Sequence, residues 1–257
     1  MSSQVDPRPL RVEEFAAQCR EALVPVSSRF SYFQACPLGE EDVRDYVDEP
    51  LAALPPKLVA ALPPFSVVLV PYLEKAEAKD KGDATGPAVT FERPPENRQA
   101  AYARTTDSGR IVLLFAIRDR SVADYHYYFY RAVAELAAEH CDQETRNRFY
   151  SLLREELRSR VHGEVDQDSW HLKETLMRRG TKLRRETKAF LEYAHQALAD
   201  TLALYLHGIC CDIDVEPGPR QLPSRYLRRR LKLLEEAYPP PEGYAVFPEE
   251  LSRINGS

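Results

Sequence analysis

Glycine is scarce in this chain, and its scarcity excludes two kinds of nucleotide site. Only 10 of the 257 residues are glycine, which is about half the usual share. No two glycines have the spacing of a phosphate-binding P-loop or of a dinucleotide-binding fingerprint. Both motifs need glycine where the backbone approaches phosphate, so the sequence predicts neither class of site.

Long apolar runs are also missing. Residues 65–73 form the most apolar stretch, but Pro71 interrupts it and Glu74 follows it. A helix that crosses a bilayer needs about twenty predominantly apolar residues, so we expect no membrane span. Residues 1–15 lack the basic start and the apolar centre of a secretory signal. The five cysteines form no CxxC pair, which fits reduced thiols better than a disulfide framework, and we expect a cytoplasmic protein.

The chain has no excess of positive charge. Its 35 Lys and Arg residues are outnumbered by 40 Asp and Glu residues, so the formal net charge is -5. The phosphate backbone of a nucleic acid would repel such a chain as a whole. Nucleic acid is therefore not the expected partner, and any such role depends on a local basic patch.

Apolar spacing and turn residues predict the order of the secondary structure. Helices are expected over residues 10–24, 39–47 and 57–62. Runs of β-branched and aromatic residues then predict four strands, over residues 66–74, 88–92, 99–107 and 110–119. Ser108 and Gly109 lie between the last two strands at the length of a tight hairpin, so at least that pair is expected to be antiparallel.

The remainder of the chain is predicted to be helical. Apolar stripes within residues 122–136, 149–161, 168–207 and 224–238 indicate four helices. Asp142 is the expected N-cap of the second of these helices, and Gly208 is expected to end the third.

This order predicts an α+β fold, because strands and helices are segregated along the chain. The fold would comprise N-terminal helices, a small and mostly antiparallel four-stranded sheet, and a C-terminal helical bundle. We expect residues 1–118 to hold the first helices and the sheet, and residues 119–257 to form the helical half. The sheet and the bundle are expected to share one core.

All six histidines lie in the helical half, which suggests a metal site as one hypothesis. No two histidines are four residues apart, so the zinc-binding HExxH helix is absent. A metal-dependent hydrolase with zinc or another transition metal stays an alternative. Its ligands would come from His126, His162, His195, His207, Asp212 and Asp214, with Glu135 or Glu164 as the base. Packing and solvation explain these residues more simply, and no cofactor is expected.

Aromatic residues surround most of the helix expected at residues 122–136. Such a helix is either buried on most sides or forms an interface. Tyr125, Tyr128 and Tyr130 are therefore candidate binding residues. Trp170, the only tryptophan, is another, because large aromatic side chains often anchor interfaces.

The last helix carries a cluster of basic residues, among which Arg225, Arg228 and Arg229 are candidate binding residues. Arginine suits carboxylate and phosphate groups, so an acidic partner or a nucleic acid fits this helix. Glu235 and Glu236 follow directly and dilute the charge, which favours an ion-paired surface.

These observations lead to one main hypothesis. We expect a non-catalytic protein that binds another protein or a second copy of itself, without a cofactor. The metal-dependent hydrolase is the first alternative, and a nucleic-acid accessory protein that uses the basic last helix is the second.

Overall fold

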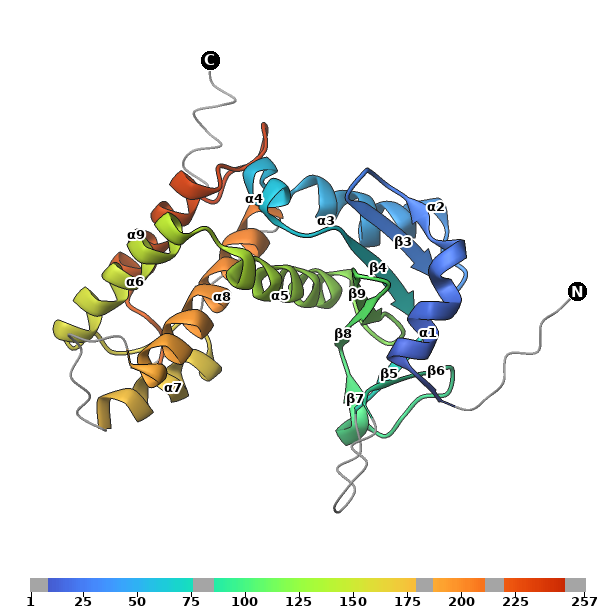
Figure 1. Ribbon diagram of the computed structural model, residues 1–257, viewed down its shortest axis with the longest axis horizontal. Helices are drawn as coiled ribbons and strands as arrows, with labels where there is room; N and C mark the ends of the chain where they lie inside the picture. The colour runs from blue at the N-terminus through green and yellow to red at the C-terminus, as the bar shows by residue number, and fades with distance from the viewer. Residues whose placement is uncertain (1–8, 76–85, 179–186, 211–219, 248–257) are drawn as a thin grey trace, which may run out of the picture. The chain divides into compact units, whose positions relative to one another are not determined.

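The computed structural model describes residues 9–75, 86–178, 187–210 and 220–247. Its internal contacts divide the chain into two compact units. The sheet unit comprises Met1–Glu49 and Pro63–Phe129, and the helical unit comprises Pro50–Leu62 and Tyr130–Ser257. The α+β class is confirmed, with N-terminal helices, antiparallel and mixed sheets, and a C-terminal group of helices (Figure 1). Over the described residues, the model contains no helix that is both long enough and apolar enough to cross a membrane.

The larger sheet of the sheet unit, sheet B, is mixed. Its strand order is β2-β3-β4-β9-β8, with parallel pairing among β3, β4 and β9 and antiparallel pairing at both edges. The central strand β4 is buried at every position, as expected of a parallel strand covered on both faces. The strands are β2 (Val24–Pro25), β3 (Phe30–Gln34), β4 (Phe65–Val70), β8 (Tyr102–Asp107) and β9 (Arg110–Ala116).

The smaller sheet, sheet A, is antiparallel and has the order β1-β6-β5-β7. Its strands are β1 (Leu10–Arg11), β5 (Tyr72–Glu74), β6 (Ala88–Thr90) and β7 (Gln99–Ala100). The two sheets are continuous in the chain, because β5 follows β4 after Pro71 and β8 follows β7 after Ala101. Each of two predicted strands is therefore divided between the sheets.

The predicted hairpin between β8 and β9 is confirmed. Asp107 pairs with Arg110 across a two-residue turn. Ser108 and Gly109 both have positive φ, 48° and 78°, which is the conformation of the turns that match the twist of a hairpin. This turn fixes the register of both strands and the direction in which Asp107 and Arg110 project.

Helices cover both faces of sheet B. The apolar residues of α1 (Val12–Cys19) pack against side chains of β4, β8 and β9. On the opposite face, Phe115 of β9 lies 5.3 Å from Tyr125 and 5.9 Å from Phe129, measured between ring centroids. Both aromatic residues belong to α5 (Val122–His140), and the boundary between the units falls inside this helix. The segment between β3 and β4 contains a short π-helix (Arg44–Asp48) and the short helices α2 (Glu40–Val43), α3 (Glu49–Ala52) and α4 (Pro56–Ala61).

The helical unit is built mainly from α6 (Gln143–Arg158), α7 (Gln167–Arg178), α8 (Lys188–Cys210) and α9 (Ser224–Ala237). Asp142 caps α6 as predicted, because its side chain accepts a hydrogen bond from the backbone N–H of Thr145 at 2.8 Å. The predicted end of a helix at Gly208 is wrong, since α8 continues to Cys210. Leu206 and Ile209 are both buried, and burial of this apolar face outweighs the weak helix propensity of one glycine.

Candidate functional site

The four histidines of the metal hypothesis lie in different surroundings. His126 is buried in the sheet unit, where its Nε2 is 2.8 Å from the backbone oxygen of Asp45. His162 is exposed, His195 is half-buried on α8, and the His207 ring lies 5.9 Å from the Tyr130 ring. Among the described residues, no group of three His, Cys, Asp or Glu side chains is placed to hold a metal ion.

The carboxylates of that hypothesis are likewise dispersed. Asp212 and Asp214 lie outside the described residues. Glu135 is 3.6 Å from Arg131, its neighbour one turn earlier on α5. Glu164 lies in a buried network of charged side chains, which is described below.

Most of the aromatic side chains at the start of α5 are buried. Tyr125 and Tyr130 are 1% and 0% exposed, and their hydroxyls donate to the backbone oxygens of Tyr46 and Pro50. Tyr128 is half-buried, with the Arg120 guanidinium 5.1 Å from its ring centroid. Tyr127, which belongs to the same aromatic run but was not among the candidate binding residues, is 39% exposed.

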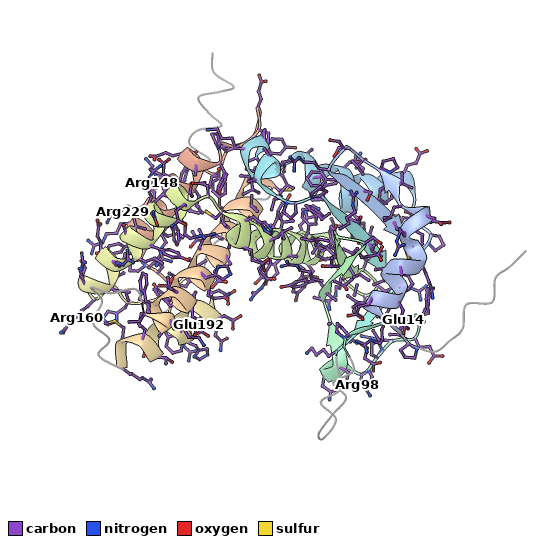
Figure 2. The ribbon with its side chains drawn as sticks, viewed as in Figure 1. Glu14, Arg98, Arg148, Arg160, Glu192 and Arg229 are labelled. Carbon is purple, nitrogen blue, oxygen red and sulfur yellow. The ribbon has the colours of Figure 1, made fainter. Side chains whose placement is uncertain are left out.

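The exposed arginines of α9 have partners within the chain. Arg225 lies over the Tyr226 ring, and Arg228 lies over the Phe247 ring. Arg229 pairs with Glu155 of α6 at 3.0 Å, and it projects outward from the helical unit (Figure 2). Trp170 is half-buried, with the Arg220 guanidinium 4.9 Å from its ring centroid.

A buried charge network joins α6, α7, α8 and α9 around Arg230. Arg230 is 0% exposed and forms a two-pronged pair with Glu164, through Nη1 at 2.7 Å and Nη2 at 3.0 Å. The same guanidinium donates to Glu156. Glu164 also accepts hydrogen bonds from Lys173 at 2.9 Å and from the Tyr193 hydroxyl at 2.5 Å. Two cations thus balance two carboxylates, which is the pairing that buried charges require.

This network suits a structural role better than acid–base chemistry. Burial alone would raise the pKa of Glu164, but Arg230 and Lys173 outweigh burial and lower this pKa to about 2. A carboxylate with so low a pKa is a poor proton acceptor at neutral pH. The backbone of Glu164 is also fixed, because it accepts a hydrogen bond from Leu222 and donates one to Arg220. The network therefore fastens the segment before α9, and α9 itself, to the other helices.

Asp200 of α8 is a second buried carboxylate, and it lacks such pairing. It is 6% exposed, and its Oδ1 accepts a hydrogen bond from Gln196 at 2.8 Å. Its Oδ2 has no hydrogen-bond partner among the described residues, since the Ser169 hydroxyl is directed to the backbone oxygen of Asp166. Burial raises the pKa of Asp200 to about 6, against smaller opposing effects of Ser169, Gln196 and Arg131.

The sheet unit contains a cavity of about 240 Å³ between α1 and sheet B. It lies near the amino ends of β4 and β9 and beside the turn of the β8–β9 hairpin. Small and apolar side chains form most of its wall. They are Ala16, Cys19 and Leu23 from the helical side and Val68 and Val112 from the sheet.

Polar side chains also line the cavity, among them the exposed Ser108 of the hairpin turn. Ser66 lies on β4, and its Oγ is 2.9 Å from the Oγ of Ser31 on β3. Arg20 and Asp107 form a two-pronged pair, with contacts of 2.6 and 2.5 Å. Arg110 begins β9, and its Nη2 donates to the backbone oxygen of Arg29 at 3.1 Å.

Arg110 brings a positive charge to the cavity, and its side chain is half-buried. Its Nε has no hydrogen-bond partner among the described residues, but this atom is buried. Burial raises the pKa of the Cys19 thiol to about 12, so this thiol stays protonated at neutral pH and is a weak nucleophile. A mostly apolar cavity with a few convergent polar groups is the usual form of a small-molecule site.

Sequence reasoning missed this site because its parts are distant in the chain. Arg20 and Asp107 are 87 positions apart, and nothing in the local pattern links them. Only the hairpin turn at Ser108 and Gly109 gave a signal, since it implies that Asp107 and Arg110 are neighbours. Comparison of the chain with protein-family models, with curated proteins and with solved structures finds no match.

Proposed function

We propose that this chain is a non-catalytic binding protein whose sheet unit holds a small, mostly apolar molecule in the cavity between α1 and sheet B. The proposal rests on the presence of this cavity. The space measures about 240 Å³ and is partly open to solvent, so a small molecule could enter it. Its walls are mostly apolar, so binding would remove apolar surface of both partners from water.

Cavity-filling variants of α1 test this proposal. Ala16 is buried and lines the cavity, whereas its neighbour Ala17 is exposed on the outer side of the same helix. The full chain would be screened by ligand-observed NMR against neutral and charged molecules of six to twelve non-hydrogen atoms. We expect binders that Ala16→Leu displaces and that the matched variant Ala17→Leu retains. If no molecule binds the parent chain, or if both variants bind equally, the proposal is wrong.

Binding of another protein is a second candidate function, and the exposure of Tyr127 favours it. This tyrosine is 39% exposed on a helix whose other aromatic residues are buried or half-buried, and tyrosine is enriched at interfaces. Self-association is the simplest form of this candidate. We expect the molar mass measured by light scattering to exceed 29.4 kDa and to fall when Tyr127 is changed to Ser. A monomeric parent chain would rule out self-association.

A further inference from the structure

Arg110 is a charged donor at the sheet side of the cavity. Its side chain is half-buried, and its Nη2 donates to the backbone oxygen of Arg29. Its Nε has no partner among the described residues, but this atom is buried and does not face the cavity. Ser31 and Ser66 contact each other through their hydroxyl oxygens and are 6% and 0% exposed, so neither hydroxyl is presented to the cavity. The guanidinium of Arg110 is therefore the group that a ligand would meet there.

Among the described residues, Asp107 is the one carboxylate of the cavity lining, and both of its oxygens accept from Arg20. The Cys19 sulfur is a protonated thiol, which is a weak acceptor. A cationic molecule would therefore meet no unpaired carboxylate in the described lining.

The charge of the lining agrees with this imbalance. The pairing of Arg20 with Asp107 cancels one positive charge against one negative charge. Arg110 is the remaining charged side chain of the lining, and among the described residues its guanidinium bonds to a neutral backbone oxygen. The cavity thus has a net charge of about +1 by this count, since arginine stays protonated in proteins. A single anionic group would match it.

The volume limits the size of the molecule. A buried apolar cavity of about 150 Å³ accepts benzene, which has six carbon atoms. By proportion, the 240 Å³ here would hold about ten non-hydrogen atoms. Ala16, Leu23, Val68 and Val112 leave an apolar surface for most of that length.

We propose that the cavity binds a monocarboxylate with an apolar chain of about this size, its carboxylate against the Arg110 guanidinium and its chain between α1 and sheet B. This inference rests on the proposed function and adds the chemical class of the ligand. A carboxylate accepts from two donors at once, and charge-assisted hydrogen bonds to arginine are among the strong ones.

Three molecules with the same chain and different end groups test the inference. Octanoate, 1-octanol and octylamine would each be titrated into the full chain by isothermal calorimetry. A hydrogen bond to a charged group contributes enough that octanoate should bind at least about tenfold more tightly than octanol. Octylamine should bind more weakly still, because its ammonium meets Arg110.

A matched pair of arginine variants then locates the carboxylate. Arg110→Met removes the charge and keeps most of the chain length, and it should weaken octanoate binding about tenfold or more while leaving octanol binding unchanged. Arg104 lies in the same hairpin but outside the cavity lining, so Arg104→Met should change neither.

Failure of the ligand class can be separated from failure of the cavity. Equal binding of all three molecules, lost in Ala16→Leu, would overturn the monocarboxylate and leave the cavity as a binding site. Octanoate binding that survives Ala16→Leu, or that Arg110→Met does not weaken, would also overturn it. No binding by any of the three, together with an empty NMR screen, would overturn both proposals.

Discussion

Arg230 and Arg110 occupy the interiors of the two units in opposite ways. Arg230 is fully buried in the helical unit, and two carboxylates surround its guanidinium. Arg110 lies beside a cavity in the sheet unit, and its Nε has no partner among the described residues. A satisfied buried charge fixes the arrangement of its helices, whereas a half-buried charge beside a cavity, with no carboxylate partner among the described residues, is able to pair with an anion. The predictions below test this difference.

Removing Arg230 should have the largest effect on stability. Arg230→Met leaves Glu156 and Glu164 buried without their shared cation, and breaking a buried pair in this way costs about 3–5 kcal/mol. The free energy of unfolding would be measured in urea, with fluorescence of Trp170 as the signal because this residue lies in the helical unit.

Arg229 provides the control for this prediction. It is the next residue on the same helix, and its pair with Glu155 is exposed at both side chains, so Arg229→Met should lose less than about 1 kcal/mol. Equal losses for the two variants would show that the buried network does not stabilise the helical unit.

Asp200 should give the helical unit a pH dependence of its own. Burial raises its pKa from 3.8 to about 6, so the folded state binds this proton more tightly than the unfolded state does. Ionisation of Asp200 therefore destabilises the fold as the pH rises from about 4 to above 6, by about 3 kcal/mol in total.

Asp200→Asn isolates this effect. At pH 7 we expect the variant to be more stable than the parent chain, and below pH 4 we expect the advantage to disappear. The difference between the two unfolding free energies, followed across this range, cancels the titration of other groups. Glu164 has the opposite effect, because its pKa is lowered in the folded state. Its ionised form stabilises the fold at pH values above the ordinary pKa of Glu, and this stabilisation is lost as the pH falls towards about 2. A constant difference across the range would contradict the prediction for Asp200.

Gly163 should be essential to the backbone contact that supports the network. Its φ is +78°, and an added Cβ would lie 2.1 Å from the backbone oxygen of Gln221. The left-handed conformation alone costs a non-glycine residue about 1–2 kcal/mol, and the clash would add to this. Gly109 has the same φ with nothing within 4 Å, so Gly109→Ala should show only the conformational part. If Gly163→Ala and Gly109→Ala lower the free energy of unfolding in urea by the same amount, the backbone around Glu164 can move to accommodate the added Cβ, and the prediction is wrong.

The sequence predicted the locally determined parts of the fold. The hairpin at Ser108 and Gly109 and the cap at Asp142 depend on a few adjacent residues, and both are present. Strand β3 was missed: its local partner β2 has only two residues, and its longer pairing is with the parallel strand β4, which begins 35 residues later. Non-local pairing of this kind leaves little trace in a local pattern.

The charge network had a signal that sequence reasoning passed over. Arg230 lies three residues after Leu227 and four before Leu234, so it falls on the apolar stripe of α9. Because Arg228 and Arg229 are adjacent and exposed, Arg230 was grouped with them as a basic surface residue and its burial was not predicted. Its partners Glu156 and Glu164 are 74 and 66 positions away, and only the folded chain brings them together.

Arg110→Met should have the smallest effect on the stability of the chain without ligand. The variant loses the hydrogen bond to the backbone oxygen of Arg29, but it also removes a buried N–H that lacks a partner. Each change is worth about 1 kcal/mol, and the two have opposite signs. We therefore expect a change within about 1 kcal/mol, measured by circular dichroism during urea unfolding. A loss as large as that of Arg230→Met would mean that Arg110 supports the fold of the sheet unit, and the contrast between the two arginines would no longer hold.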